Sequence, residues 1–119
     1  MPRYLTLSQI ESALNREKSV EQFLGSSEGE CIAWLEMRPS TEGVELWHYE
    51  VFDDGDENAA DLYSFAPTGE GWPEMPVSHH ETFADALRAA QQNHGASNER
   101  WVNQSVIQDE YLDYRETKK

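Results

Sequence analysis

The run CIAWLEM at residues 31–37, followed by VELWHYEVF at residues 44–52, decides the fold of this chain. Both runs are rich in β-branched and aromatic residues, which favour β-strands. Between the two runs, Pro39 is expected to end the first strand, and Gly43 allows the chain to reverse direction. These features predict an antiparallel hairpin. The run ADLYSFA at residues 60–66 predicts a third, shorter strand, and the short connections favour an antiparallel meander.

Helical patterns flank the predicted strands. Near the N-terminus, Thr6 or Ser8 can cap a helix whose apolar residues share one face, namely Ile10, Ala13 and Leu14. A second, short helix is predicted over residues 19–25 and ends at Gly25. After the strands, Thr82 caps a helix over residues 83–94, and Gly95 ends it.

A last helix opens near Ser105, which has the capping-box spacing to Gln108. Around its start, Trp101 is expected to fill a gap in the core, and Tyr111 and Tyr114 are expected to pack on the sheet with their hydroxyls toward water. The alternative is a recognition edge formed by Trp101, Asn103, Gln104 and Tyr111. The predicted fold class is therefore α+β, a single domain over residues 1–119. It is a three-stranded antiparallel meander flanked by N-terminal and C-terminal helices, in the order α-α-β-β-β-α-α.

The charge of the chain is strongly negative and unevenly placed. The formal net charge is −14, and residues 28–75 hold thirteen acids and a single base, Arg38. Nucleic acid and membrane surfaces are not expected as partners, because phosphate contacts need lysine and arginine. Cys31 has no second cysteine to pair with, and no apolar run reaches the length of a signal peptide or a membrane span. These features predict a cytoplasmic protein.

The run VFDDGDENAADLY at residues 51–63 contains an acidic turn around Gly55. Its acids are Asp53, Asp54, Asp56 and Glu57. A calcium loop that starts at Asp54 would need glycine and glutamate where the chain has Ala59 and Phe65. A wet turn also gives carboxylates no reason to hold a proton for catalysis. We therefore expect a solvated turn, and we predict no catalytic residue, no metal and no cofactor.

Strand alternation sorts the side chains of the predicted sheet into two faces. The aliphatic face holds Ala33, Leu35, Met37, Val44, Leu46 and Leu62. The aromatic face holds Trp34, Glu36, Glu45, Trp47, Tyr49, Tyr63 and Phe65. Either the terminal helices cover the aromatic face too, which makes a three-layer domain, or this face is a partner surface.

The partner surface is the basis of a functional hypothesis. A non-enzymatic module would bind a basic protein through aromatic anchors and acidic side chains, by cation–π contacts and charge steering. The predicted binding residues are Trp34, Glu36, Glu45, Trp47, Tyr49, Asp53, Asp54, Asp56, Glu57 and Tyr63. In size and acidity the chain is similar to bacterial immunity and antitoxin-like inhibitors, although no motif carries this likeness.

Two alternatives belong to other functional classes. The first is a homo-oligomeric structural protein whose aromatic face is a self-interface. The second is a small enzyme or ligand-binding domain with His48 or His79 in a pocket.

Overall fold

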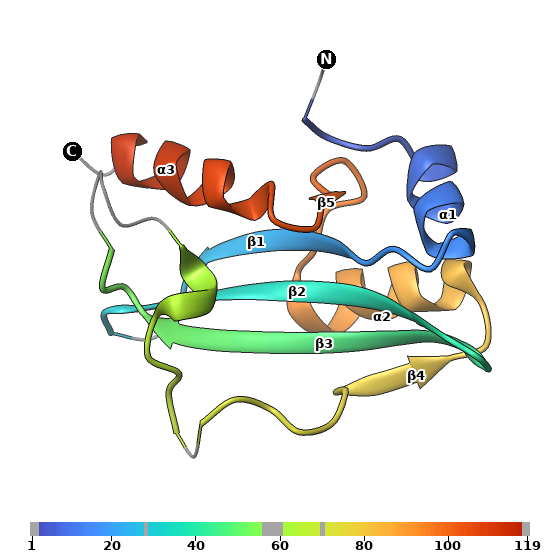
Figure 1. Cartoon of the computed structure of the whole chain (residues 1–119), viewed down its shortest axis with the longest axis horizontal. Coiled ribbons are helices and arrows are strands. Elements are labelled where there is room, and N and C mark those ends of the chain that lie inside the picture. Colours follow the sequence, from blue (N-terminus) through green and yellow to red (C-terminus); the bar gives the residue numbers. More distant parts are fainter. Residues whose placement is uncertain (1–2, 28, 56–60, 70, 118–119) are drawn as a thin grey trace.

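The computed structural model describes residues 3–27, 29–55, 61–69 and 71–117 of the chain. The elements are α1 (Leu7–Asn15), β1 (Val20–Ser26), β2 (Cys31–Ser40), β3 (Gly43–Phe52), η1 (Leu62–Ser64), β4 (Ser78–His80), α2 (Phe83–His94), β5 (Val102–Asn103) and α3 (Ile107–Thr117). Within the described residues the strands form one five-stranded antiparallel sheet of order β4-β3-β2-β1-β5 (Figure 1). The α+β class is confirmed, but the three-stranded meander and the predicted element order are not.

The central hairpin is confirmed and is longer than predicted. Strands β2 and β3 pair from Cys31 opposite Phe52 to Ser40 opposite Gly43. Strand β2 can include Pro39, which has no backbone N–H to donate. Strand β1 pairs with β2 only as far as Met37, so no strand on that side requires a donor from Pro39. Gly43 has φ +142°, and a Cβ built there would lie 2.1 Å from the carbonyl oxygen of His80. The close approach of β4 therefore requires glycine at this turn.

The predicted helix over residues 19–25 is wrong, because this segment is strand β1. It pairs with β2 on one side and with β5 on the other. Its first three residues, Val20, Glu21 and Gln22, are all buried, since successive side chains enter opposite layers of the protein. Tertiary pairing has overridden the weak helical preference of this segment.

The predicted third strand is also wrong. Residues 62–64 form the short 3₁₀ helix η1, which Asp61 caps. The chain touches the sheet there through an isolated bridge between Val51 and Pro67. The outer strands are instead β4 and β5, which have three and two residues respectively and were not predicted.

The remaining helices agree with the sequence. Thr6 caps α1 in a capping box with Gln9, and Thr82 caps α2, which ends at Gly95 with φ +69°. Helix α3 forms, but the expected capping box of Gln108 does not. The carboxamide of Gln108 instead accepts a hydrogen bond from the Leu62 amide at 2.8 Å and donates to Asp61 at 3.2 Å. It thereby fixes η1 to the start of α3.

Helices pack on both faces of the sheet, but the aromatic face is only partly covered, because a cavity remains open there. Helices α1 and α2 bury the aliphatic face, and α3 and η1 pack on the aromatic face. In Figure 1, α2 passes behind the sheet and η1 lies in front of it. Leu62, which was assigned to the aliphatic face, lies in η1 and packs on the aromatic side with Phe65. In the described part of the chain, every helix is too short and too polar to cross a membrane.

Candidate functional site

Four of the predicted binding residues surround one cavity on the aromatic face, which we call the aromatic cavity. These residues are Trp34, Glu36, Tyr49 and Tyr63. The other described lining residues are Glu21, Arg38, Trp72 and Gln104. The cavity has a volume of about 280 Å³, so it can hold a group much larger than one water molecule, whose share of liquid volume is about 30 Å³.

Two carboxylates face each other in the aromatic cavity. Glu21 of β1 pairs directly with Glu36 of β2, and their exposed fractions are 1% and 4%. Like charges directly opposite each other on neighbouring strands are destabilising, and burial increases the cost. The surroundings of the two carboxylates must therefore differ.

Glu36 is paired with a cation. Arg38 donates to both of its carboxylate oxygens, at 3.0 and 3.2 Å, and the Tyr49 hydroxyl donates at 2.6 Å. Burial alone would raise the pKa of Glu36, but hydrogen bonds from Arg38, Tyr49 and Ser19 hold it below its ordinary value. Glu36 is thus an ionised carboxylate with its charge compensated.

Glu21 has neutral partners. Its Oε1 accepts hydrogen bonds from the Tyr63 hydroxyl at 2.5 Å and from the Ser105 amide at 3.1 Å. Burial raises the pKa of Glu21 to about 7, although these hydrogen bonds act in the opposite direction. Burial and the nearby Glu21 also raise the pKa of the Tyr63 hydroxyl. The ionised form of Glu21 is therefore only weakly stabilised by its surroundings.

Aromatic rings form the walls around the two carboxylates. Trp34 and Tyr49 are stacked with their centroids 5.1 Å apart. Tyr63 stands at 64° and Trp72 at 61° to the Trp34 ring, with centroids 6.1 and 6.3 Å from it. The indole N–H of Trp34 is buried without a hydrogen-bond partner among the described residues. A buried donor of this kind is usually satisfied by water or a ligand.

Glu45 and Trp47 lie beside the cavity and do not line it. The Arg38 guanidinium lies 4.0 Å from the centre of the Trp47 ring, and the Trp47 indole donates to Glu45 at 3.1 Å. Only 8% of Trp47 is exposed. Trp47 therefore packs against the Arg38 guanidinium through a cation–π contact. It is not the exposed anchor that the sequence predicted.

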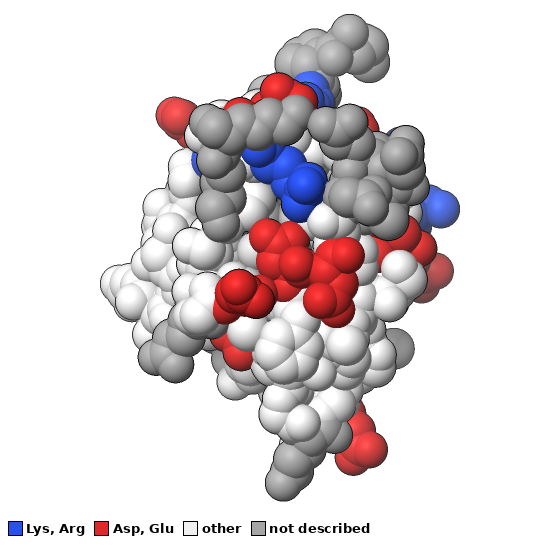
Figure 2. Space-filling view, turned by 90° about the vertical axis from the view of Figure 1, so that its left-hand side faces the viewer, with Lys and Arg blue, Asp and Glu red and all other residues white. Residues whose placement is uncertain are grey.

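The acidic turn is a separate feature at one end of the sheet. Asp53 accepts a hydrogen bond from the Tyr111 hydroxyl, Asp54 is exposed, and Arg115 donates to the Gly55 carbonyl at 2.8 Å. Figure 2 views this end of the molecule and shows acidic side chains gathered there. Four residues of extended chain separate Asp53 from Tyr49, which corresponds to about 13 Å. Asp56 and Glu57 lie outside the described residues.

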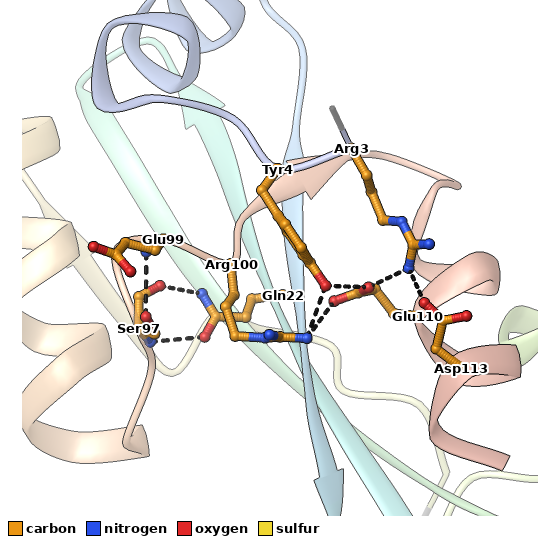
Figure 3. A network of polar contacts seen from close by, with 8 residues as sticks. All are labelled: Arg3, Tyr4, Gln22, Ser97, Glu99, Arg100, Glu110 and Asp113. Carbon is orange, nitrogen blue, oxygen red and sulfur yellow. Dashed lines mark hydrogen bonds and ion pairs between the residues drawn. The ribbon is translucent and has the colours of Figure 1, made fainter. Parts of the chain in front are cut away.

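A second polar network fixes α3 over the aromatic face (Figure 3). The buried Glu110 accepts from Arg3 at 2.5 Å, from the Tyr4 hydroxyl at 2.8 Å and from Arg100 at 3.3 Å. Arg100 also lies over the Tyr4 ring, 4.8 Å from its centre. These contacts join the N-terminal segment to α3. Ser105, whose amide bonds Glu21, lies just before α3 and is held in place with it.

The histidines are not part of the aromatic cavity. His48 stacks on His94 with a centroid distance of 5.4 Å, and burial lowers the pKa of both. His79 approaches Ser40 at 3.2 Å. No group of three or more His, Cys, Asp or Glu side chains is placed to hold a metal ion, as far as the structure describes the chain.

Sequence reasoning missed three lining residues, Glu21, Arg38 and Trp72, and named Gln104 only in the alternative recognition edge. Glu21 would have been found if residues 20–26 had been taken as a strand, because alternation then places it beside Glu36. Arg38 was available by the same alternation, two residues after Glu36. Trp72 comes from a segment without regular structure, and no local pattern in the sequence places it on the sheet.

No protein-family model, no curated protein and no solved structure matches this chain.

Proposed function

We propose that this protein is a non-enzymatic binding module for a basic protein partner, which it contacts through the aromatic cavity and its rim. The observation that carries the proposal is the facing pair Glu21 and Glu36. Arg38 is the one basic residue among the described residues that line the cavity, and it compensates Glu36. A cationic side chain from a partner would compensate Glu21 as well, in a site where water competes weakly.

The rim of the cavity supports a protein partner. Tyr63 and Trp72 are 38% and 42% exposed, and Met75 and Val77, near Trp72 in the chain, are 73% and 50% exposed. Exposed tyrosine, tryptophan and methionine side chains are typical of interface anchors. The net charge of −14 would steer a basic protein toward this surface.

The test uses a peptide that carries both lysine and arginine as the probe. Its binding to the wild-type chain is measured by calorimetry at about 50 mM and about 300 mM salt, because charge pairing at a surface weakens as salt screens it. Trp72→Ala should weaken binding at least about tenfold, as expected for an interface anchor. Glu11→Gln on α1 is the matched control, because this residue is exposed and its helix covers the opposite face.

Equal losses in the two variants, or no loss in either, would show that the peptide binds the acidic surface without using the cavity. That result would reject the proposed function. A concentration-dependent dimer in which the Trp72 fluorescence is protected from quenching would instead assign the rim to self-association.

A further inference from the structure

We infer that the aromatic cavity binds the ammonium group of a lysine side chain of the partner in preference to an arginine guanidinium. This inference rests on the proposed function and names the chemistry that the same cavity recognises. It depends on three features of the cavity: the position that Arg38 already occupies, the free acceptor of Glu21, and the arrangement of the rings.

The guanidinium position of the site is already filled. The Nε and Nη2 atoms of Arg38 donate to both oxygens of Glu36, at 3.2 and 3.0 Å, while the guanidinium plane lies over Trp47. The Tyr49 hydroxyl completes this arrangement by donating to the same carboxylate. A second guanidinium would have to displace Arg38, which the chain itself holds close by. An incoming arginine therefore gains little.

Glu21 offers a single remaining acceptor. Its Oε1 is occupied by Tyr63 and Ser105, and its Oε2 accepts no hydrogen bond from a described residue. A guanidinium binds best to two coplanar acceptors, whereas an ammonium is a compact charge with three rotatable donors. One carboxylate oxygen therefore suits an ammonium better.

The rings suit a compact cation. Trp72 stands at 61° to Trp34 and at 65° to Tyr49, so the walls enclose a corner and do not form parallel plates. A flat guanidinium stacks on a single ring face, whereas an ammonium and the methylene groups beside it can contact several faces at once. The aromatic walls would also shield the methylene groups of the lysine from water.

The experiment compares three peptides of the same sequence that carry lysine, arginine or norleucine at the same positions. Norleucine keeps the apolar stem and removes the charge. Binding is followed in NMR spectra of the indole N–H groups, with the four tryptophans assigned. Trp34 and Trp72 line the cavity and should shift with the lysine peptide, whereas Trp101, which packs among the aliphatic residues of the other face, serves as an internal control.

We expect the lysine peptide to bind at least about fivefold more tightly than the arginine peptide, with the norleucine peptide weaker than both. Glu21→Gln should reduce lysine binding at least about tenfold, as for the loss of a charge-assisted hydrogen bond. Glu11→Gln should leave it unchanged. Thermal unfolding of each variant confirms that it is folded.

Equal or tighter binding of the arginine peptide would overturn the lysine inference. If that binding still depends on Trp72, the proposed function stands without it. Peptide binding that shifts neither Trp34 nor Trp72, and that is insensitive to Trp72→Ala, would reject both.

Discussion

On the aliphatic face, Leu35, Met37 and Leu46 are fully buried beneath α1 and α2, within a cluster of apolar side chains. On the aromatic face, α3 and η1 cover only part of the sheet, and the uncovered part contains Glu21 and Glu36 inside a cavity. Filling that space with aliphatic residues would cost less free energy than burying two carboxylates. The comparison shows that the aliphatic face supplies stability, whereas the aromatic face carries polar groups that stability alone does not explain.

The largest expected effect lies on the aliphatic face. Leu35→Ala removes a side chain that is 0% exposed and should reduce the free energy of unfolding by about 3 kcal/mol, because it loses apolar burial and leaves a cavity. Tyr63→Phe, on the rim of the aromatic cavity, should cost only about 1 kcal/mol, which is typical of one hydrogen bond. Urea unfolding of both variants measures the difference. Similar losses of unfolding free energy in the two variants would mean that the aliphatic face does not supply more stability than the aromatic face.

A gain in stability is expected at Glu21. Its pKa in the folded state is about 7, above the ordinary value of 4.5, so the folded chain binds more protons than the unfolded chain between these values. Stability therefore falls as the pH rises from about 4.5 to about 7 and is flat above that range. The groups that face Glu21 are Glu36, Tyr63 and Ser105.

Glu21→Gln should remove this cost. The variant should be more stable than the wild type by about 3 kcal/mol at pH 8, with little difference at pH 5. Thermal or urea unfolding across this pH range measures the effect, and Glu11→Gln is again the matched control. A variant that is destabilised at pH 8 would show that the Glu21 charge stabilises the cavity.

Replacement of Arg38 should reduce the stability of the fold, by less than the gain expected for Glu21→Gln. Arg38→Met keeps the apolar stem over Trp47 and leaves Glu36 buried without a cation, which should cost about 2 kcal/mol near neutral pH. We place the cost below that of a fully buried pair, because 40% of the Arg38 side chain is exposed. The pKa of Glu36 lies below its ordinary value, so the contribution is present above about pH 4.5 and is lost as the pH falls through the folded pKa.

The control for Arg38 is another arginine in an exposed ion pair. Arg88→Met breaks the pair with Asp85, in which the side chains are 64% and 50% exposed, and should change stability by less than about 0.5 kcal/mol. If the two substitutions reduce the free energy of unfolding equally, Arg38 would contribute no more than an exposed ion pair. The buried charge of Glu36 would then not depend on Arg38.

The two faces also differ in how far the sequence could predict them. Alternation in β2 and β3 correctly separated Leu35 and Met37 from Trp34 and Glu36. The two sides of these strands carry different residue types, so the sequence indicates which residues share a face. Strand β1 lacks this separation, because Val20 shares a face with Gln22 and Phe23 shares a face with Glu21, and its apolar residues also fit a helical spacing. A segment of seven residues is too short for that ambiguity to be resolved by length.

Other elements could not be predicted for a different reason. Strands β4 and β5 have three and two residues, and they exist because a longer strand beside them offers free backbone groups. Trp72 reaches Trp34 through a segment without regular structure. The cavity therefore depends on tertiary placement, and sequence analysis supplied Trp34, Glu36 and Tyr49 on the central hairpin and Tyr63 beyond it.

The smallest effect is expected at the acidic turn. Asp54 is exposed and follows Asp53, which already lies about 13 Å from Tyr49 along the strand, whereas the Debye length is about 10 Å at 0.1 M salt. Asp54→Lys should therefore leave the dissociation rate of a basic peptide unchanged and slow its association about twofold at low salt, because steering acts over distance whereas anchoring requires contact. Stopped-flow tryptophan fluorescence measures both rates, and Glu11→Lys makes the same change of charge on the opposite side of the sheet. A faster dissociation in Asp54→Lys would place the acidic turn in contact with the partner. Equal slowing in both variants would mean that net charge, and not the position of the turn, steers the encounter.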